Sequence, residues 1–329
     1  MPSTLYPIKF CPILKQTPWG GERIIPFKHL DKTLAKVGES WEVSDVSGNI
    51  SIVNEGPFAG QPLTTLIEKF KARLVGQKVY EKYGNHFPLL IKFIDARQDL
   101  SIQVHPNDDV AHECGYANGK TEMWYIMDAH PDASLLFGFN RKLTQDEYRL
   151  MAHDGTICEA IRKHPVKEGD CFFIRAGQVH AIGSNIFLIE IQQSSDVTYR
   201  IFDYNRLGTD GKPRQLHISE AEKAIDFSLH TDEKAVSYSC EPNKRNEMVK
   251  CPYFTTSSYH LTAPMTIPLN DIDSFVILTA YKGRFTVNSD NNCETIVNAG
   301  ETLLIPAETT SADITPLDSE CKFLGVHID

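Results

Sequence analysis

The segment QDLSIQVHP, Gln98–Pro106, decides how the rest of the chain is interpreted. Successive side chains of a β-strand point to opposite faces, so this segment predicts a strand with Ile102 and Val104 on one face. Gln103 and His105 then lie side by side on the other face. An imidazole and an amide oxygen at that spacing look like two ligands of one metal site, and we expect other strands to supply the remaining ligands.

The overall composition is that of an ordinary globular protein. The chain has 329 residues, of which 41% are hydrophobic and 23% charged, so two domains are expected, with one large domain as the alternative. Its formal net charge of −10 argues against a surface that binds nucleic acid or an anionic membrane. No signal peptide or membrane-spanning run is visible, and the eight cysteines form no CxxC pair, so we expect reduced thiols in a cytoplasmic protein.

Two further segments supply candidate ligands. KTEMWYIM, Lys120–Met127, predicts a strand in which Lys120, Glu122 and Trp124 share a face. VKEGDCFFIRAGQVHAIG, Val166–Gly183, predicts a turn, a buried strand and a glycine-containing loop before His180. The candidate ligands, two with nitrogen and two with oxygen donors, are therefore Gln103, His105, Glu122 and His180. This set suits Zn²⁺, and Mn²⁺, Fe²⁺ and Co²⁺ are compatible with it.

Each of these residues also has an ordinary structural explanation. A single histidine is more often a hydrogen-bonded structural residue than a ligand, and Glu122 alone is more often solvated or paired with Lys120. Only the joint pattern favours metal binding. Trp19 and Trp41 lie among short strands and turns near the N-terminus, where core packing is a more common role than ligand contact.

Three regions carry helical patterns. Residues 62–83 place apolar side chains at helical spacing and predict one helix packed on a sheet. The capping-box spacing of Thr144 and Glu147 predicts a short helix, and a second short helix is expected over Thr156–Lys163. We expect these two to cover an opening. Another capping box, starting at Ser219, predicts a helix that ends near residue 227.

The strand predicted over Ile186–Tyr204 is polar at even positions and apolar at odd ones. Glu190, Asp196 and Arg200 belong to the polar face. In a simple sheet this face would lie in water, but in a β-barrel it lines a cavity while the apolar face packs on an outer layer. A bulge near Ser194 and the serine after it would break the register, so the alternation is strongest within each half.

One segment repeats another. VNAGETLLIPAE, Val297–Glu308, parallels the start of the segment that leads to His180, at an offset of 131 residues, and places Ser311 where His180 stands. This predicts a mainly β, duplicated barrel in which only one half holds metal. We expect a metal-bearing domain over residues 1–245, with helical insertions, and a degenerate β-domain over 246–329; the N-terminal strands are free to complete either sheet.

Several motifs together resemble a known family. They are QxHP at Gln103–Pro106, KTEMWY at Lys120–Tyr125 and AGQVHAIG at Ala176–Gly183, supported by PWGG at Pro18–Gly21, GESWEVS at Gly38–Ser44 and the run from Glu190 to Arg200. They resemble mannose-6-phosphate isomerases of the short bacterial kind, which are zinc-dependent members of the cupin superfamily. The resemblance spans most of residues 6–230 and implies a double cupin, two jelly-roll barrels with a few helices.

The resemblance also implies an activity and its residues. The reaction would interconvert mannose 6-phosphate and fructose 6-phosphate through an enediol, with one zinc ion per chain held by the four candidate ligands. Arg200 would be an active-site residue, with Lys120, Glu190 and Asp196 nearby. We expect Glu190 to carry the proton, with a zinc-bound water or hydroxide as the alternative base.

The remaining site residues have less defined roles. Asp196 either orients Arg200 or forms a structural ion pair. Lys92, Ser101 and Trp19 are secondary candidates for contact with the substrate or its phosphate, although Lys92 lies in an apolar strand and could simply reach to solvent.

The expected partner is a small sugar phosphate, with no nucleic acid and no membrane, and the expected state is a monomer or homodimer. Two other classes stay open. One is a different cupin metalloenzyme, such as another sugar-phosphate isomerase or an iron dioxygenase. The other is a non-catalytic sugar-binding double cupin. A complete ligand set accompanied by Lys120, Glu190 and Arg200 favours an enzyme over a binding module.

Overall fold

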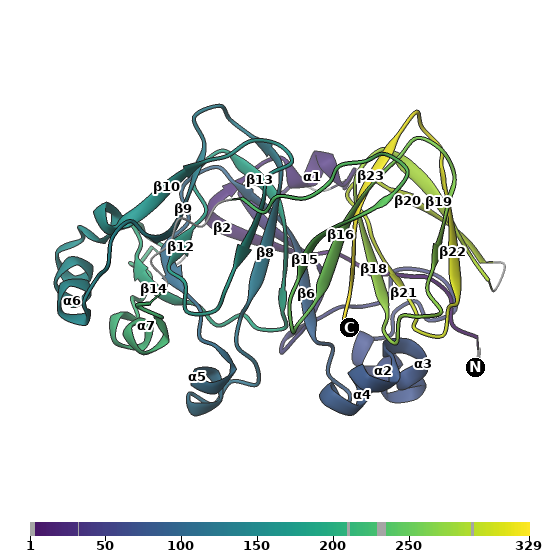
Figure 1. Ribbon diagram of the computed structural model, residues 1–329, viewed down its shortest axis with the longest axis horizontal. Helices are drawn as coiled ribbons and strands as arrows, with labels where there is room; N and C mark the ends of the chain where they lie inside the picture. The colour runs from purple at the N-terminus through teal and green to yellow at the C-terminus, as the bar shows by residue number, and fades with distance from the viewer. Residues whose placement is uncertain (1–3, 32, 209–210, 229–234, 291–292) are drawn as a thin grey trace. The chain divides into compact units, whose positions relative to one another are not determined.

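The computed structural model describes residues 4–31, 33–208, 211–228, 235–290 and 293–329, and it is mainly β, as the sequence predicted (Figure 1). The chain divides into two compact units. The central unit comprises Leu14–Trp41 and Leu89–Val236, and the terminal unit comprises Met1–Ile13, Glu42–Pro88 and Ser237–Asp329.

The central unit contains two sheets. The first has the order β11-β8-β13-β6-β2-β3, and the second has the order β10-β9-β12-β7-β14. The strands of the first sheet are β2 (Ile13–Gly21), β3 (Val37–Val43), β6 (Leu89–Ala96), β8 (Glu122–Ala129), β11 (Cys171–Ile174) and β13 (Ile186–Gln193). Those of the second are β7 (Ile102–Val104), β9 (Ser134–Phe139), β10 (Ile161–Pro165), β12 (His180–Ala181) and β14 (Tyr199–Phe202).

The terminal unit also contains two larger sheets, with the orders β1-β21-β18-β23-β16-β15 and β17-β22-β19-β20. The strands of the first sheet are β1 (Ile8–Lys9), β15 (Arg245–Lys250), β16 (Thr255–Leu261), β18 (Val276–Lys282), β21 (Thr302–Ile305) and β23 (Cys321–His327). Those of the second are β17 (Met265–Pro268), β19 (Arg284–Ser289), β20 (Cys293–Asn298) and β22 (Ser311–Pro316). A small hairpin joins β4 (Asp45–Val46) and β5 (Asn49–Ile50).

The two units repeat one topology. The run β11-β8-β13-β6-β2 of the central unit has the same connections as β21-β18-β23-β16-β15, and β10-β9-β12-β7 has the same connections as β20-β19-β22-β17. Strands β11 and β21 are 131 residues apart at both ends. The turns before them match too, since Gly169 and Gly300 both have φ 88°. The duplication predicted from the sequence repeat is therefore confirmed.

The N-terminal strands are divided between the two units. Strand β1 pairs with β21, where Ile8 lies opposite Leu304, so it completes a sheet of the terminal unit. Strands β2 and β3 belong to the sheet of the central unit. Residues 42–88, which the sequence boundary at 245 had assigned to the metal-bearing half, lie in the terminal unit.

The prediction of a single helix over residues 62–83 is wrong. The structure has three short helices there, α2 (Leu63–Phe70), α3 (Ala72–Val75) and α4 (Gln77–Tyr83). Lys71 with φ 49° and Gly76 with φ 96° interrupt them, because neither backbone conformation fits a right-handed helix. The apolar stripe of α2 is nevertheless buried as its spacing predicted.

The other helix predictions succeed in part. The capping box of Thr144 and Glu147 forms and opens α6 (Gln145–Asp154). The expected helix over 156–163 is only a 3₁₀ turn, η1 (Ile157–Ala160), followed by β10. The capping box at Ser219 does not form, because the N-cap of α7 (Ile218–Ala224) is His217, two residues earlier, and His217 makes no side-chain capping hydrogen bond.

Two shorter helices complete the description, α1 (Ile24–Phe27) and α5 (Asp108–Glu113). No helix among the described residues is long and apolar enough to cross a membrane.

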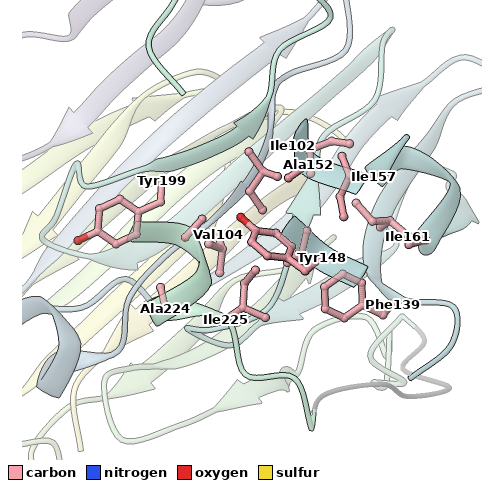
Figure 2. Close-up of a cluster of buried hydrophobic side chains, with 14 of the residues drawn as sticks. Ile102, Val104, Phe139, Tyr148, Ala152, Ile157, Ile161, Tyr199, Ala224 and Ile225 are labelled. Atoms are coloured by element: carbon pink, nitrogen blue, oxygen red, sulfur yellow. The ribbon is translucent and has the colours of Figure 1, made fainter. Parts of the chain in front are cut away.

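The helices α6 and α7 pack on the outer face of the five-stranded sheet (Figure 2). Ile102 and Val104 of β7 and Tyr199 of β14 contact a buried cluster that includes Tyr148 of α6 and Ala224 of α7. The expectation that α6 covers an opening is therefore wrong. By covering the apolar face, these helices leave the polar face of β7 and β14 to face the interior of the unit.

We predict that Thr144→Ala destabilises the central unit by about 1 kcal/mol, because the first turn of α6 loses the oxygen that accepts the Glu147 N–H at 3.2 Å. Denaturant unfolding measures the change. Thr144→Ser keeps the accepting oxygen and is the matched control, which should stay close to wild type. Equal stabilities of the alanine and serine variants would show that the cap contributes nothing.

Candidate metal centre and active site

Alternate residues of several strands converge on one pocket in the central unit. Thr17 and Trp19 of β2, Glu39 and Trp41 of β3, Lys92 and Ile94 of β6, Ser101 and Gln103 at β7, and Thr198 and Arg200 at β14 all line it. Each pair is two residues apart, as expected for side chains on one face of a strand. Lys120, Glu190, Asp196 and Arg214 line the same pocket. The polar face predicted around Glu190 therefore does line a cavity.

The strand register sets the contacts of Glu190. Glu190 lies opposite Lys92 of β6 on one side and opposite Trp124 of β8 on the other. The Lys92 Nζ donates to Glu190 Oε2 at 2.7 Å, and the Trp124 Nε1–H donates to Glu190 Oε1 at 2.9 Å. Both carboxylate oxygens thus receive hydrogen bonds from cross-strand neighbours.

The facing sheet brings the metal-ligand candidates together. Gln103 lies opposite His180 of β12 and opposite Arg200 of β14. Glu122 Oε2 lies 3.5 Å from His105 Nε2, and Glu122 Oε1 lies 3.4 Å from His180 Nε2. Across the part of the chain that the structure describes, these are the only three histidine, cysteine or acidic residues whose ligand atoms gather in this way, within 4.8 Å of one another.

Backbone carbonyls fix the tautomers of both histidines. Nδ1 of His105 lies 2.8 Å from the Val197 carbonyl oxygen, and Nδ1 of His180 lies 2.8 Å from the Gln178 carbonyl oxygen. Since a carbonyl only accepts, each Nδ1 carries the proton and each Nε2 presents a lone pair toward Glu122. Burial is the main cause that lowers the pKa of both histidines, that of His180 to about 4, so both rings are neutral near pH 7.

The Glu122 carboxylate is the strongest indication of a cation-binding site. Both of its oxygens are buried and accept no hydrogen bond from any described residue. Burial, followed by the negative charge of Glu190, raises its pKa above the ordinary value. The Lys120 Nζ, 3.5 Å from Glu122 Oε2, compensates part of this buried charge. A divalent cation between the carboxylate and the two imidazoles would compensate it further.

Gln103 is the fourth candidate metal ligand. Its amide Nε2 lies 3.4 Å from His105 Nε2 and 3.3 Å from His180 Nε2, and its Oε1 accepts a hydrogen bond from the Ser101 hydroxyl at 3.3 Å. Rotating the amide by half a turn brings the oxygen toward the cluster. The Ser101 hydroxyl can then accept from the amide nitrogen, so its hydrogen bond is kept. The four predicted ligands therefore fit a divalent cation.

Lys92 is not a lysine that reaches to solvent. Its Nζ lies 2.7 Å from Glu190 and 3.7 Å from Glu39, and it lies over the ring of Trp41 at 5.3 Å. Burial alone would lower the pKa of Lys92, but the carboxylates of Glu190 and Glu39 raise it. Burial likewise would raise the pKa of Glu190, but Lys92 and Lys120 lower it below its ordinary value. Both groups are therefore charged.

Asp196 and Arg200 line the same pocket without pairing with each other in the described structure. Asp196 is exposed and lines the pocket, but among the described residues it makes no ion pair with Arg200. Arg200 Nη1 instead donates to the Gln215 carbonyl oxygen at 2.9 Å. The Nε of Arg200 is buried and finds no acceptor among the described residues.

The structure adds residues that the sequence analysis missed. Asp203, which is buried, accepts from Arg206 Nη2 at 2.7 Å and from Arg214 Nε at 2.7 Å, and Arg214 also lines the pocket. No spacing signal could identify Arg214, because it follows a loop after β14. Glu39 does have a sequence signal, since it alternates with Trp41 in the GESWEVS motif, Gly38–Ser44.

Of the remaining predicted residues, Lys120 lies 3.5 Å from Glu122 and lines the pocket, as do Ser101 and Trp19. Trp19 is buried, so it serves both as a core residue and as a pocket wall. Every residue that the sequence analysis named for catalysis or substrate binding thus lies at this one pocket.

The strand register also shows why no equivalent site is found among the described residues of the terminal unit. By the shared topology and the 131-residue offset, Ser311 corresponds to His180, and its partner Pro268 corresponds to Gln103. Val276, opposite Ile305, corresponds to Glu122, opposite Ile174. The interior there is an apolar cluster that includes Phe285, Leu303 and Phe323.

Comparisons with known proteins point to one enzyme family. A family model described as phosphomannose isomerase type I, catalytic domain, matches residues 8–161. The mannose-6-phosphate isomerase ManA of Bacillus subtilis is 35% identical over 283 residues, which are 85% of this chain and 87% of the relative. A mannose-6-phosphate isomerase of Streptococcus mutans is 31% identical over 313 residues, 94% of each chain.

A solved structure supports the same family. The crystal structure of the mannose 6-phosphate isomerase from Bacillus subtilis matches with a TM-score of 0.87 and 29% sequence identity, covering 98% of this chain and 99% of that chain. The family resemblance drawn from the sequence motifs is confirmed, and the chain belongs to the mannose-6-phosphate isomerase family.

Proposed function

We propose that the pocket of the central unit isomerises mannose 6-phosphate and fructose 6-phosphate with one zinc ion held by Gln103, His105, Glu122 and His180. The observation that carries the proposal is the buried Glu122 carboxylate, whose oxygens accept no hydrogen bond within the described part of the chain and have the Lys120 ammonium, 3.5 Å away, as a cationic neighbour. It faces two imidazoles whose Nε2 atoms are free to bind a cation. When bound there, the cation supplies Lewis-acid stabilisation of negative charge on the substrate oxygens.

In this proposal, Glu190 is the base that transfers the proton. Glu190 is ionised and lines the pocket, so it can accept a proton without first losing one. A C–H bond of the substrate breaks, an O–H bond forms on Glu190, the electron pair forms the C1–C2 double bond, and the carbonyl π pair moves to its oxygen. The proton then returns from Glu190 to the neighbouring carbon, while the O–H bond of the former hydroxyl breaks to give the new carbonyl and that hydroxyl proton passes to the former carbonyl oxygen. Lys120, at the pocket wall beside Glu122, contributes positive charge for the enediolate.

Arg200 and Arg214 provide the anchor for the phosphate. Together with Arg206 and Asp203, they form a cluster of three guanidiniums and one carboxylate. A phosphate monoester carries about −1.5 to −2 charge near pH 7, which the cluster's excess of positive charge matches. The buried Nε of Arg200 without an acceptor is a donor that a phosphate oxygen would satisfy. Lys92 lies in the same pocket, but Glu190 and Glu39 already neutralise it.

All eight cysteines are free thiols, which favours a reducing compartment such as the cytoplasm.

The zinc proposal predicts that chelation abolishes isomerase activity and that zinc restores it. Parallel add-back of Mn²⁺, Fe²⁺ and Co²⁺, with metal content read by elemental analysis, identifies the metal that supports turnover. Full activity in metal-free protein would contradict the proposal. Restoration by another of these metals and not by zinc would contradict the assignment of zinc alone.

The same proposal predicts that His105→Ala and His180→Ala lose bound metal and lower kcat by on the order of 100-fold or more. His153→Ala, in an exposed position of α6, is the matched control and should keep both metal and activity.

For Glu190→Gln we expect metal and substrate binding to persist while turnover falls by on the order of 100-fold, because the amide cannot take up the proton. Hydrogen exchange between solvent and C1 or C2 of the substrate measures the step directly. Exchange at the wild-type rate in this variant would rule out Glu190 as the base.

Arg214→Ala should raise KM for the sugar phosphate by about 10-fold and weaken competitive inhibition by inorganic phosphate to a similar extent, since a charged hydrogen bond is lost. We expect kcat to change little. Arg97→Ala removes an exposed arginine that does not line this pocket and should leave KM unchanged. An unchanged KM in Arg214→Ala would place the phosphate elsewhere.

A further inference from the structure

We propose that Glu39 is a positioning residue that shares Lys92 with Glu190 and thereby keeps Glu190 able to accept the substrate proton. This inference rests on the proposed role of the pocket as an isomerase site with Glu190 as its base. It goes beyond that role, because Glu39 touches neither the metal ligands nor, in this proposal, the reacting carbons.

The geometry places Lys92 between two carboxylates. Its Nζ lies 2.7 Å from Glu190 Oε2 and 3.7 Å from Glu39 Oε2. The side chains of Lys92 and Glu190 are 6% and 4% exposed, and that of Glu39 is 19% exposed. The positive charge of the Lys92 ammonium group is therefore compensated by these two carboxylates and not by water.

Each carboxylate also receives an indole N–H. The Trp124 Nε1–H donates to Glu190 at 2.9 Å, and the Trp41 Nε1–H donates to Glu39 at 2.6 Å. The two carboxylates thus have matching surroundings, with one tryptophan and a share of one lysine each. A displacement of the Lys92 ammonium toward Glu39 exchanges one partner for another of the same kind.

The reaction changes the charge on only one of the two carboxylates. When Glu190 takes the proton from the substrate carbon, its negative charge disappears, and Lys92 remains as a buried cation. Glu39 is then the nearby anion that compensates it. Without Glu39, the protonated state of Glu190 would leave Lys92 buried and without an ion-pair partner within 4 Å, so Glu190 would be a poorer base.

Other groups that act on Glu190 do not replace Glu39. The charged or titratable groups on the packed elements are Lys92 on β6, Lys120 before β8, Glu122 on β8 and His180 on β12. Lys120 and Lys92 are cations, and His180 is neutral. Glu122 faces the two imidazoles, so in this proposal its charge compensates the metal ion and not Lys92.

The test is Glu39→Gln, which keeps the size and the acceptor for the Trp41 N–H but removes the charge. We expect kcat to fall about 10-fold with KM changed less than about 2-fold, because a weaker base transfers the proton more slowly. The acidic limb of the kcat profile should move to lower pH, since Lys92 then pairs only with Glu190 and holds it ionised. Glu39→Asp should recover part of the loss.

The matched control is Glu22→Gln, which makes the same change at an exposed residue outside this pocket. Metal content is measured in every variant, so that a folding defect is recognised. If the glutamine variant does not fold, the partial loss of kcat expected for Glu39→Asp is measured in its place. A wild-type kcat and pH profile in Glu39→Gln would overturn the inference. A rise in KM alone would overturn it too, because Glu39 would then contact substrate. An inactive wild-type enzyme with bound zinc would instead contradict the proposed function itself.

Discussion

Charged side chains buried inside a β-barrel are the constraint on which the rest of this structure depends. Glu122, Glu190 and Lys92 lie in the interior of the central unit, each almost fully shielded from water. A buried charge is stable only when a partner of opposite charge, a set of hydrogen bonds or a metal compensates it. Glu190 accepts hydrogen bonds from Lys92 and Trp124, whereas the Glu122 oxygens accept none within the described part of the chain and have the Lys120 ammonium at 3.5 Å. This difference is the basis for proposing that Glu190 transfers the proton and Glu122 binds the metal.

The alternation of strands makes this interior possible. The odd residues of β14 and the even residues of β7 pack against α6 and α7, so the neighbouring positions are left to face inward (Figure 2). An apolar outer face covered by helices therefore allows a polar inner face, which is the reverse of an ordinary two-sheet sandwich. The register then sets pairs such as Glu190 with Lys92, because cross-strand neighbours on one face lie within hydrogen-bond reach.

The duplication shows how little sequence change separates a site from a core. Both units have the same strand order, and the turns before β11 and β21 share the same glycine conformation. In the terminal unit, Ser311, Pro268 and Val276 stand where the ligands would be, and large apolar side chains fill the space. One topology thus supports an apolar core or a polar pocket, depending on which side chains the inward positions carry.

The sequence by itself determined the mainly β duplicated fold, the four metal-ligand candidates and the polar strand through Glu190 and Arg200, because these depend on local alternation and on motifs with fixed spacing. It did not determine the break of the helix at Lys71 and Gly76, the absence of a pair between Asp196 and Arg200, or the roles of Glu39 and Arg214. Those features depend on which strands become neighbours, in what register, and how loops return to the pocket. Contacts between residues far apart in the chain follow from the closed tertiary structure, since no periodicity within a single segment encodes them.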